Sequence, residues 1–371
     1  MVKKNKIEIN KFDKKFFSNT IISWQRKYGR HMLPWQNTKN IYYIWLSEIM
    51  LQQTQVNTVI PYYQRFLKKF PNIMSLAQAK LEKVMELWSG LGYYSRARNL
   101  HICAKHIFFK CNGIFPKDFI SLINLPGIGQ STASAIRVFA YGKRNAILDG
   151  NVKRILIRVL GINCSSNIKF IEKKLWYYAI NLLPKENIEI YTQGLMDFGS
   201  IICVRIKPKC EICPLKLCCI SYKTKKINNF LIKRKNIKNH SIMMFIIIDD
   251  DYVLFQKRSS KGIWGDLLSF PEYILKNKII NCLNDNLKNF IDLEIKKFVS
   301  LFGIIKNYLI LPKIFHKLTH LKFNIIPCQI FLKKCFLKEK KNNFIWYPIK
   351  KIKHSPIPAP VRKIFSQILK K

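Results

Sequence analysis

Four cysteines with close and unequal spacing, Cys203-x6-Cys210-x2-Cys213-x5-Cys219, constrain this chain more than any other feature. Four thiolates on one compact loop suit either a tetrahedral zinc ion or a 4Fe-4S cluster, because both take sulfur ligands in a near-tetrahedral arrangement. Zinc is the simpler structural interpretation, but zinc modules usually pair two short Cys-x2-Cys knuckles, and only one is present here. Cys218 also lies within reach, so the chemistry alone leaves the choice between Cys218 and Cys219 open.

The composition indicates a folded and strongly basic protein. The 371 residues carry 65 Lys and Arg against 21 Asp and Glu, a formal charge of +44, and 49% of them are hydrophobic. The length suits two domains, and the hydrophobic content excludes disorder for most of the chain. A charge of this size favours a polyanionic partner such as nucleic acid, although the richness in Lys, Ile, Asn and Phe also has the character of an AT-rich genome.

The amino terminus and the cysteine count bear on the compartment. The start MVKKNKIEINKF is basic, but no apolar run follows it, and no stretch reaches the ~18 apolar residues of a membrane span. An odd total of 11 cysteines without a secretory signal argues against a disulfide scaffold. We therefore expect a cytoplasmic monomer with no membrane partner.

The apolar pattern divides the chain into a helical part and a β-rich part. Apolar residues recur at helical spacing up to about Tyr222, which predicts a mainly α domain over residues 1–222. Residues 223–240 are basic with little periodicity and suit an exposed connector. Residues 241–371 predict an α+β domain with a helix near residues 278–291. The expected strands are Met243–Ile248, Tyr252–Phe255, Phe323–Ile330 and Phe344–Tyr347.

A glycine turn between two helical stretches is the first motif that carries chemistry. It reads Leu125-Pro126-Gly127-Ile128-Gly129 and is followed directly by a helical run that contains Ser131. Backbone N–H groups at the start of such a helix can hold a phosphate oxygen at the positive end of the helix dipole. Taken alone, the turn is more often an ordinary helix-helix connection.

Two acidic residues are candidates for catalysis. Asp149 precedes a helical run beside the basic pair Lys153-Arg154, where the ordinary interpretation is a helix N-cap. A carboxylate so close to a phosphate-binding hairpin could instead stabilise a positive charge on a sugar. Glu48 lies in an apolar helical stretch, where burial would raise its pKa and let it donate a proton, unless it faces solvent. The Gln and Thr residues after it, Gln52 among them, could reach base edges or fill the gap left by an extruded base.

Several long motifs in register resemble the iron-sulfur helix-hairpin-helix DNA glycosylases, and most closely their adenine-specific MutY family. The matching segments are WLSEIMLQQTQV, LGYYSRARNL, LPGIGQSTASAI, LDGNVKRIL and the cysteine spacing. GIWGDLLSFPE and the segment around His320 resemble the carboxy-terminal, Nudix-like domain of that family, so the resemblance spans almost the whole chain.

The resemblance implies base excision repair: hydrolytic removal of adenine mispaired with 8-oxoguanine or guanine in double-stranded DNA, leaving an abasic site. It implies that Glu48 protonates the adenine and then helps to activate water, and that Asp149 stabilises the sugar cation. It also implies a 4Fe-4S cluster on Cys203, Cys210, Cys213 and Cys219, which selects Cys219 over Cys218. Further expected site residues are Asn151 and Tyr93 around the sugar and base stack, Gln52 inserted into the duplex, Arg30 and Trp35 in the adenine pocket, and Leu125, Gly127, Gly129, Ser131, Lys153, Thr319 and His320 as other DNA contacts.

Three alternatives remain at this point. An endonuclease III-like glycosylase that also cuts the DNA backbone needs a Lys two residues after the last hairpin glycine, and Ser131 stands there. A Nudix pyrophosphohydrolase needs a glutamate-rich metal-binding helix, which the sequence after Gly262 does not supply. A structural DNA-binding protein has no need for both Glu48 and Asp149.

One departure from the family concerns the loop that inspects 8-oxoguanine. Bacterial relatives commonly carry Phe-Ser-His there, and this chain carries Leu318-Thr319-His320. Thr319 and His320 keep the hydroxyl and the imidazole, so hydrogen bonding can persist. The loss of the aromatic ring at Leu318 removes a stacking contact and bears on how strongly the protein separates 8-oxoguanine from guanine.

Overall fold

The chain folds into two compact units in a computed structural model that describes residues 13–164, 167–225, 227, 237–275, 293, 295–318, 321–336 and 343–368. The first unit comprises Met1–Gln78 and Asn99–Lys233, and the second comprises Ala79–Arg98 and Arg234–Lys371. The second unit therefore joins a short helical segment to the β-rich part of the chain, although the two are far apart in sequence.

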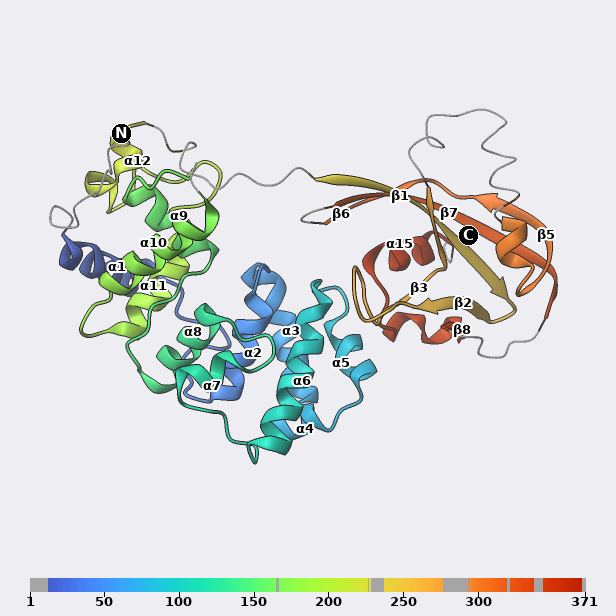
Figure 1. Cartoon of the computed structure of the whole chain (residues 1–371), viewed down its shortest axis with the longest axis horizontal. Helices are drawn as coiled ribbons and strands as arrows, with labels where there is room; N and C mark the ends of the chain where they lie inside the picture. Colours follow the sequence, from blue (N-terminus) through green and yellow to red (C-terminus); the bar gives the residue numbers. More distant parts are fainter. Residues whose placement is uncertain are drawn as a thin grey trace. The chain divides into compact units, whose positions relative to one another are not determined.

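Helices make up the first unit (Figure 1). A core cluster of this unit includes Phe17, Ile155, Leu195 and Phe198, all almost completely buried. The helices are α1 (Lys14–Tyr28), α2 (Ile41–Leu51), α3 (Val56–Lys69), α4 (Ile73–Ala77), α7 (Phe119–Ile123), α8 (Gln130–Tyr141), α9 (Gly150–Val159), α10 (Ile168–Asn181), α11 (Ile188–Ile201), the 3-10 turn η2 (Lys216–Cys218) and α12 (Ile220–Lys223), while α6 (Tyr94–Lys110) begins in the second unit and continues into the first.

The cap of α2 sets the face that this helix buries. The side chain of Asn40 accepts a hydrogen bond from the backbone N–H of Tyr42 at 3.0 Å, which satisfies one of the unpaired N–H groups at the helix start. Trp45 and Ile49 then face the interior and are buried. With apolar neighbours on most sides, Glu48 on the same helix is only partly exposed.

The turn between α7 and α8 needs glycine at one position and leaves space at the other. Gly127 has a φ of +81°, and a Cβ built there would lie 2.9 Å from the Cβ of Asn99. Gly129 is the extended N-cap residue of α8, and a Cβ there would meet no atom within 4 Å. No side chain caps α8, so backbone N–H groups at its start face outward from the helix. The hairpin predicted from the sequence is confirmed.

A mixed sheet forms the centre of the second unit (Figure 1). The long strands β1 and β7 pair in parallel, with Ile242 opposite Ile325, and the remaining pairs are antiparallel. The main path runs β3-β2-β1-β7-β5, while β4 pairs with β1, β6 with β7 and β8 with β2. The elements are α5 (Leu81–Trp88), β1 (Lys238–Asp249), β2 (Tyr252–Lys257), β3 (Leu268–Ser269), β4 (Glu272–Leu275), β5 (Gly303–Ile310), β6 (Ile314–Lys317), β7 (Leu321–Cys335), β8 (Phe344–Pro348), the 3-10 turn η3 (Ile349–His354) and α15 (Ala359–Ile368).

Aromatic side chains join the last helix to this sheet. The ring of Phe365 on α15 lies 5.8 Å from that of Phe255 on β2 and 5.1 Å from that of Phe270, centroid to centroid. Elsewhere in the unit, Phe245 on β1 stacks on Phe298 at 5.1 Å. Aromatic rings at these separations bury large apolar areas, so they fix α15 against the sheet.

The predicted fold class is confirmed: a mainly α part precedes an α+β part that contains every strand expected from the sequence. The short strands β3, β4 and β6 and the longer β5 were not predicted, because segments of two to four residues carry too little alternation and β5 is largely exposed. The helix expected near residues 278–291 and residues 228–236 of the connector lie outside the described residues. Within the described residues, no helix combines the length and the apolar character that crossing a bilayer requires.

The contrast between the two hairpin glycines yields a stability prediction. Gly127→Ala should lower the free energy of unfolding by about 1–2 kcal/mol, because an L-residue in the left-handed region is strained and its Cβ displaces Asn99. Gly129→Ser should leave stability unchanged or slightly higher, since Ser is a preferred N-cap and the space is open. Thermal unfolding of the full chain measures both. Equal melting temperatures for Gly127→Ala and the wild type would contradict this account of the turn.

Candidate active site and cysteine loop

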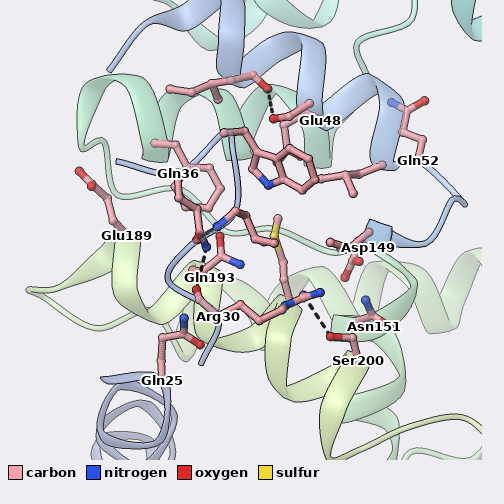
Figure 2. Close-up of a pocket in the computed structure, with 18 of the residues that line it drawn as sticks. Gln25, Arg30, Gln36, Glu48, Gln52, Asp149, Asn151, Glu189, Gln193 and Ser200 are labelled. Carbon is pink, nitrogen blue, oxygen red and sulfur yellow. Dashed lines mark hydrogen bonds between the residues drawn. The ribbon is translucent and has the colours of Figure 1, made fainter. Parts of the chain in front are cut away.

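A cleft of about 1550 Å³ opens in the first unit and gathers most of the polar residues singled out from the sequence. Its walls come from the end of α1 and the segment after it, from α2, from the starts of α8 and α9, and from α11. Figure 2 shows Glu48 and Asp149 entering the cleft from α2 and from the start of α9, with Asn151 beside Asp149. Candidate residues that line it are Arg30, Trp35, Glu48, Gln52, Ser131, Asp149 and Asn151.

Glu48 is placed to hold a proton at neutral pH. Its side chain lines the cleft on the wall formed by α2 and is only partly exposed. Burial, and secondly the neighbouring charge of Asp149, raise the pKa of Glu48 from 4.5 to about 8. A carboxylic acid of this pKa is still protonated at pH 7 and can act as a general acid.

Asp149 is both a helix cap and a cleft residue. Its Oδ1 accepts a hydrogen bond from the backbone N–H of Val152 at 2.8 Å, so the ordinary cap interpretation is correct for the start of α9. Burial raises its pKa, while the backbone N–H groups of Val152 and Asn151 and the charges of Arg154 and Lys153 oppose that rise. Capping α9 therefore holds the carboxylate at a fixed point of the cleft wall.

A hydroxyl of the hairpin helix steadies the segment that carries Asp149. The Oγ of Ser131, near the start of α8, accepts a hydrogen bond at 3.0 Å from the backbone N–H of Leu148. Gln52, at the end of α2, donates at 3.2 Å to the Oγ1 of Thr132, the next residue of α8. The hairpin helix is thus bonded to both segments that carry the acidic pair.

Arg154 connects the Asp149 turn to the first cysteine. Its guanidinium donates to the Oδ1 of Asn151 at 2.8 Å and to the backbone oxygens of Gly199 at 2.5 Å and Cys203 at 2.7 Å. A Cβ on Gly199 would lie 2.5 Å from the Cβ of Asn151, so only glycine permits this close approach of α9 and α11.

A buried carboxylate anchors the opposite wall of the cleft. Asp197 on α11 is fully buried and accepts hydrogen bonds from the Nε of Arg30 at 2.8 Å and from the backbone N–H of Arg30 at 2.8 Å. Gln25 and Gln193 also donate to it, at 3.1 Å and 3.0 Å. Arg30 reaches on to the Oγ of Ser200 at 3.1 Å, as Figure 2 shows. A charge buried this deeply is tolerated because it is paired and hydrogen-bonded, so the anchor holds Arg30 in place.

Among the remaining candidates that the structure describes, only Trp35 lines the cleft. Trp35 is a lining residue and packs edge-on against Tyr63 at 5.3 Å, whereas Tyr93 belongs to the second unit and is not among the lining residues. Lys153 pairs with Glu172 at 2.5 Å instead of facing the cleft. Leu125 is buried under the hairpin turn that contains Gly127 and Gly129, while Thr319 and His320 lie outside the described residues.

Sequence reasoning gave no role to Arg154, Asp197 or Gln193. A signal existed for Asp197, because an acidic residue inside an apolar helical run shortly before a cysteine motif calls for a buried partner. Arg154 was noted only as one of a basic pair beside Asp149. Its link to Cys203 depends on the packing of α9 on α11, which no local pattern encodes.

The four predicted cysteines are electrostatic neighbours. Burial, followed by Cys203, Cys219 and Cys210, raises the pKa of Cys213 to about 12, although a backbone N–H opposes part of the rise. Burial and Cys203 also raise the pKa of Cys210, and burial, Cys203 and Cys210 raise that of Cys219. Burial raises the pKa of Cys218 to about 11, and Cys219 is the thiol that adds to this rise. The electrostatic neighbours thus match the predicted set better than a set containing Cys218.

The donor chemistry of the loop fits a sulfur-ligated group. Arg158, buried behind the loop, donates to the Sγ of Cys203 at 3.5 Å and to the backbone oxygens of Val204 at 2.7 Å and Arg205 at 2.9 Å. In the part of the chain that the structure describes, no set of three or more His, Cys, Asp or Glu converges closely enough to hold a metal ion.

Comparison with known proteins places the chain in a family. The sequence matches the HhH-GPD superfamily of base excision DNA repair proteins over residues 46–179 and the NUDIX domain over residues 243–367. The adenine DNA glycosylases of Buchnera aphidicola subsp. Baizongia pistaciae and subsp. Acyrthosiphon pisum are 43% and 42% identical, over 95% and 96% of this chain and 97% and 99% of theirs. The structure of a thermostable thymine-DNA glycosylase has a TM-score of 0.54 and 29% identity, and covers 58% of this chain and 100% of its own. The chain therefore belongs to the adenine DNA glycosylase family.

Proposed function

We propose that this protein is a monofunctional DNA glycosylase that hydrolyses the bond between adenine and deoxyribose where adenine is mispaired with 8-oxoguanine or guanine. The observation that carries the proposal is the presence in one cleft of Asp149 and of Glu48, whose pKa burial raises to about 8, in a chain of this family. The partner is double-stranded DNA, consistent with the formal charge of +44. We expect the protein to act in the bacterial cytoplasm as a monomer.

The target nucleotide must first leave the duplex, because an adenine inside the helix stack cannot reach carboxyl groups in the cleft. Flipping costs a few kcal/mol, and a mispair reduces that cost. Arg30 and Trp35 line the side of the cleft assigned to the base, and Gln52 at the end of α2 is the candidate for filling the space left in the duplex. The uncapped start of α8 offers backbone N–H groups to a phosphate beside the flipped nucleotide.

The chemical step needs one acid and one anion. Glu48 donates its proton to a ring nitrogen of adenine, the glycosidic bond breaks with its electron pair leaving on the base, and the sugar becomes an oxocarbenium-like cation. Asp149 stabilises that cation as a carboxylate. The Glu48 carboxylate then accepts a proton from a water molecule as its oxygen bonds to the sugar carbon, which regenerates the acid and yields the abasic site.

The surroundings of the two carboxyls decide which one keeps the proton. Two backbone N–H groups and the charges of Arg154 and Lys153 favour the ionised form of Asp149, whereas burial and the charge of Asp149 both favour the protonated form of Glu48. The pair therefore shares one proton at neutral pH, with Glu48 as its holder.

The hairpin supports hydrolysis without cleavage of the DNA backbone. Backbone cleavage through a Schiff base needs an amine near the sugar, and Ser131 occupies the position where the endonuclease III-like pattern has Lys. The hydroxyl of Ser131 is engaged with the N–H of Leu148, which makes it a support for the Asp149 segment.

The cysteine loop is proposed to hold a 4Fe-4S cluster through Cys203, Cys210, Cys213 and Cys219. The cluster supplies four iron-sulfur bonds that cross-link the loop. The loop presents Lys207 and Lys209, both exposed, as candidate contacts to the DNA backbone. The second unit is proposed to read the base opposite adenine through the loop at Leu318-Thr319-His320.

Replacing the proposed acid tests the assignment. Glu48→Gln should slow single-turnover release of adenine opposite 8-oxoguanine by about 10²–10⁴-fold while DNA binding persists, because the amide has the same shape but no transferable proton. The matched control is Glu189→Gln, since Glu189 lines the same cleft but pairs with Lys39 at 2.6 Å. Adenine should be released by the wild type and by the control. A Glu48→Gln rate within a few-fold of the wild type would remove Glu48 from the chemistry.

Metal content tests the cofactor proposal. Protein purified without oxygen should contain iron and acid-labile sulfide in equal amounts, about four of each per chain, and absorb visible light as a brown solution. Cys219→Ser should lower that content, whereas Cys218→Ser should keep it, because Cys219 has the closer links to the other three thiols. Stoichiometric zinc in place of iron, or equal losses in both variants, would contradict the proposed ligand set.

A further inference from the structure

One turn of the second unit contacts two segments that are distant in sequence. Residues 258–267, between β2 and β3, pack against the hairpin formed by β6 and β7 and also against the start of α6. All these segments belong to the second compact unit. The turn therefore connects the hairpin to α6 through direct contacts with both.

Trp264 forms the contact with the hairpin. Its backbone has a φ of +56°, unusual for a bulky residue, and its side chain is buried. The indole lies 5.1 Å from Phe323 and 5.8 Å from His316, centroid to centroid, and these two residues face each other across β6 and β7. Strained backbone persists only where surrounding contacts hold it, and here both strands of the hairpin supply those contacts. The hairpin closes with a hydrogen bond of 2.8 Å from the N–H of Leu318 to the oxygen of Leu321.

Asp266 forms the contact with α6. It also lies in the left-handed region, with a φ of +61°, where glycine would be unstrained. Its Oδ2 accepts a hydrogen bond of 2.9 Å from the Nη1 of Arg98, and the two side chains are only 18% and 17% exposed. The guanidinium lies directly over Gly265, where a Cβ would be 2.7 Å from Nη1. A half-buried pair in such a close fit is worth more than a surface ion pair.

The segment before Arg98 carries Tyr93 and packs around the buried side chain of Arg96. Arg96 is buried and lies over the rings of Trp88 and Tyr93, with its guanidinium carbon 5.4 Å from each ring centroid. Its Nη2 donates to the oxygen of Gly92 at 3.3 Å. Tyr93 has a φ of +47°. A shift of Arg98 is therefore carried to the Tyr93 turn through one helical turn and a packed guanidinium.

We propose that the ion pair between Arg98 and Asp266 is a positioning contact that fixes the β6–β7 hairpin relative to the Tyr93 turn, and thereby sets how strongly 8-oxoguanine is preferred over guanine opposite adenine. The inference rests on the proposed function. Neither residue touches the substrate in this account. Both act by holding strands β6 and β7, which flank the sequence Leu318-Thr319-His320, in place relative to the Tyr93 turn.

The test is a double-mutant cycle on discrimination. We would measure single-turnover adenine release opposite 8-oxoguanine and opposite guanine for Arg98→Gln, Asp266→Asn and the double variant of the full chain, at one salt concentration. Asn tolerates the left-handed region, so Asp266→Asn should fold. The ratio of the two rates should fall about 3- to 10-fold in each single variant and no further in the double variant. Arg98→Lys should recover part of the ratio.

The two single variants change the net charge of the protein in opposite directions, which distinguishes a positioning effect from an electrostatic effect on DNA binding. Arg98→Gln lowers the net charge and Asp266→Asn raises it, so an effect of charge on DNA binding would move the two variants in opposite directions. The matched control is Glu82→Gln, because Glu82 on α5 and Lys257 at the end of β2 also form an ion pair within the second unit, at 3.5 Å, but are exposed. That variant should keep the wild-type ratio, and all variants should keep the wild-type melting temperature within a few degrees.

Two results would overturn the inference in distinguishable ways. If the wild type prefers 8-oxoguanine and both single variants keep that preference, the coupling is wrong while the proposed function stands. If the wild type releases adenine equally from both mispairs or from neither, the proposed reading of the opposite base fails, and the coupling fails with it.

Discussion

Burial of the Glu48 carboxyl, reinforced by the neighbouring charge of Asp149, is the constraint on which the chemistry of the first unit depends. Burial disfavours the ionised form of both carboxyls, and the charge of Asp149 adds to this effect at Glu48, whereas backbone N–H groups and basic neighbours favour the ionised form of Asp149. The backbone N–H groups at the start of α9 determine where that charge stays. Division of one proton between two acids gives the cleft an acid and an anion at the same pH, which is what cleavage of a glycosidic bond requires.

The hydrogen bonds around this pair explain why a helical fold and a cysteine loop occur together. Arg154 joins Asn151, beside the anion, to the backbone oxygen of Cys203, and Ser131 joins the hairpin helix to the residue before Asp149. The position of Asp149 therefore depends on two structures that are themselves suited to DNA: a helix start with free N–H groups and a basic loop. In this account, the loop affects catalysis by holding Asp149 in place.

Sequence reasoning recovered the features that are encoded locally. The helical and β-rich halves follow from apolar periodicity, and the cap of α9 by Asp149 follows from its place before a helical run. Features that depend on packing between distant segments were not recovered. The ion pair of Asp266 with Arg98 joins residues separated by 168 positions, and the anchor of Arg30 on Asp197 joins residues separated by 167. Short or exposed strands such as β3 and β5 were also missed, because pairing within the sheet, and not alternation, defines them.

Direct titration of the Glu48 carboxyl tests the central claim. Carbon-13 labelling of glutamate carboxyls, with Glu48→Gln to assign the signal, would report its pKa in the wild type and in Asp149→Asn. We expect a midpoint of about 8 for Glu48 in the wild type. Between pH 4.5 and about 8 the folded state keeps a proton that the unfolded state has lost, so the stability of the folded state falls as pH rises through this range. In Asp149→Asn the midpoint should be lower, because the neighbouring charge is gone. A wild-type midpoint near 4.5, unchanged in Asp149→Asn, would contradict the account.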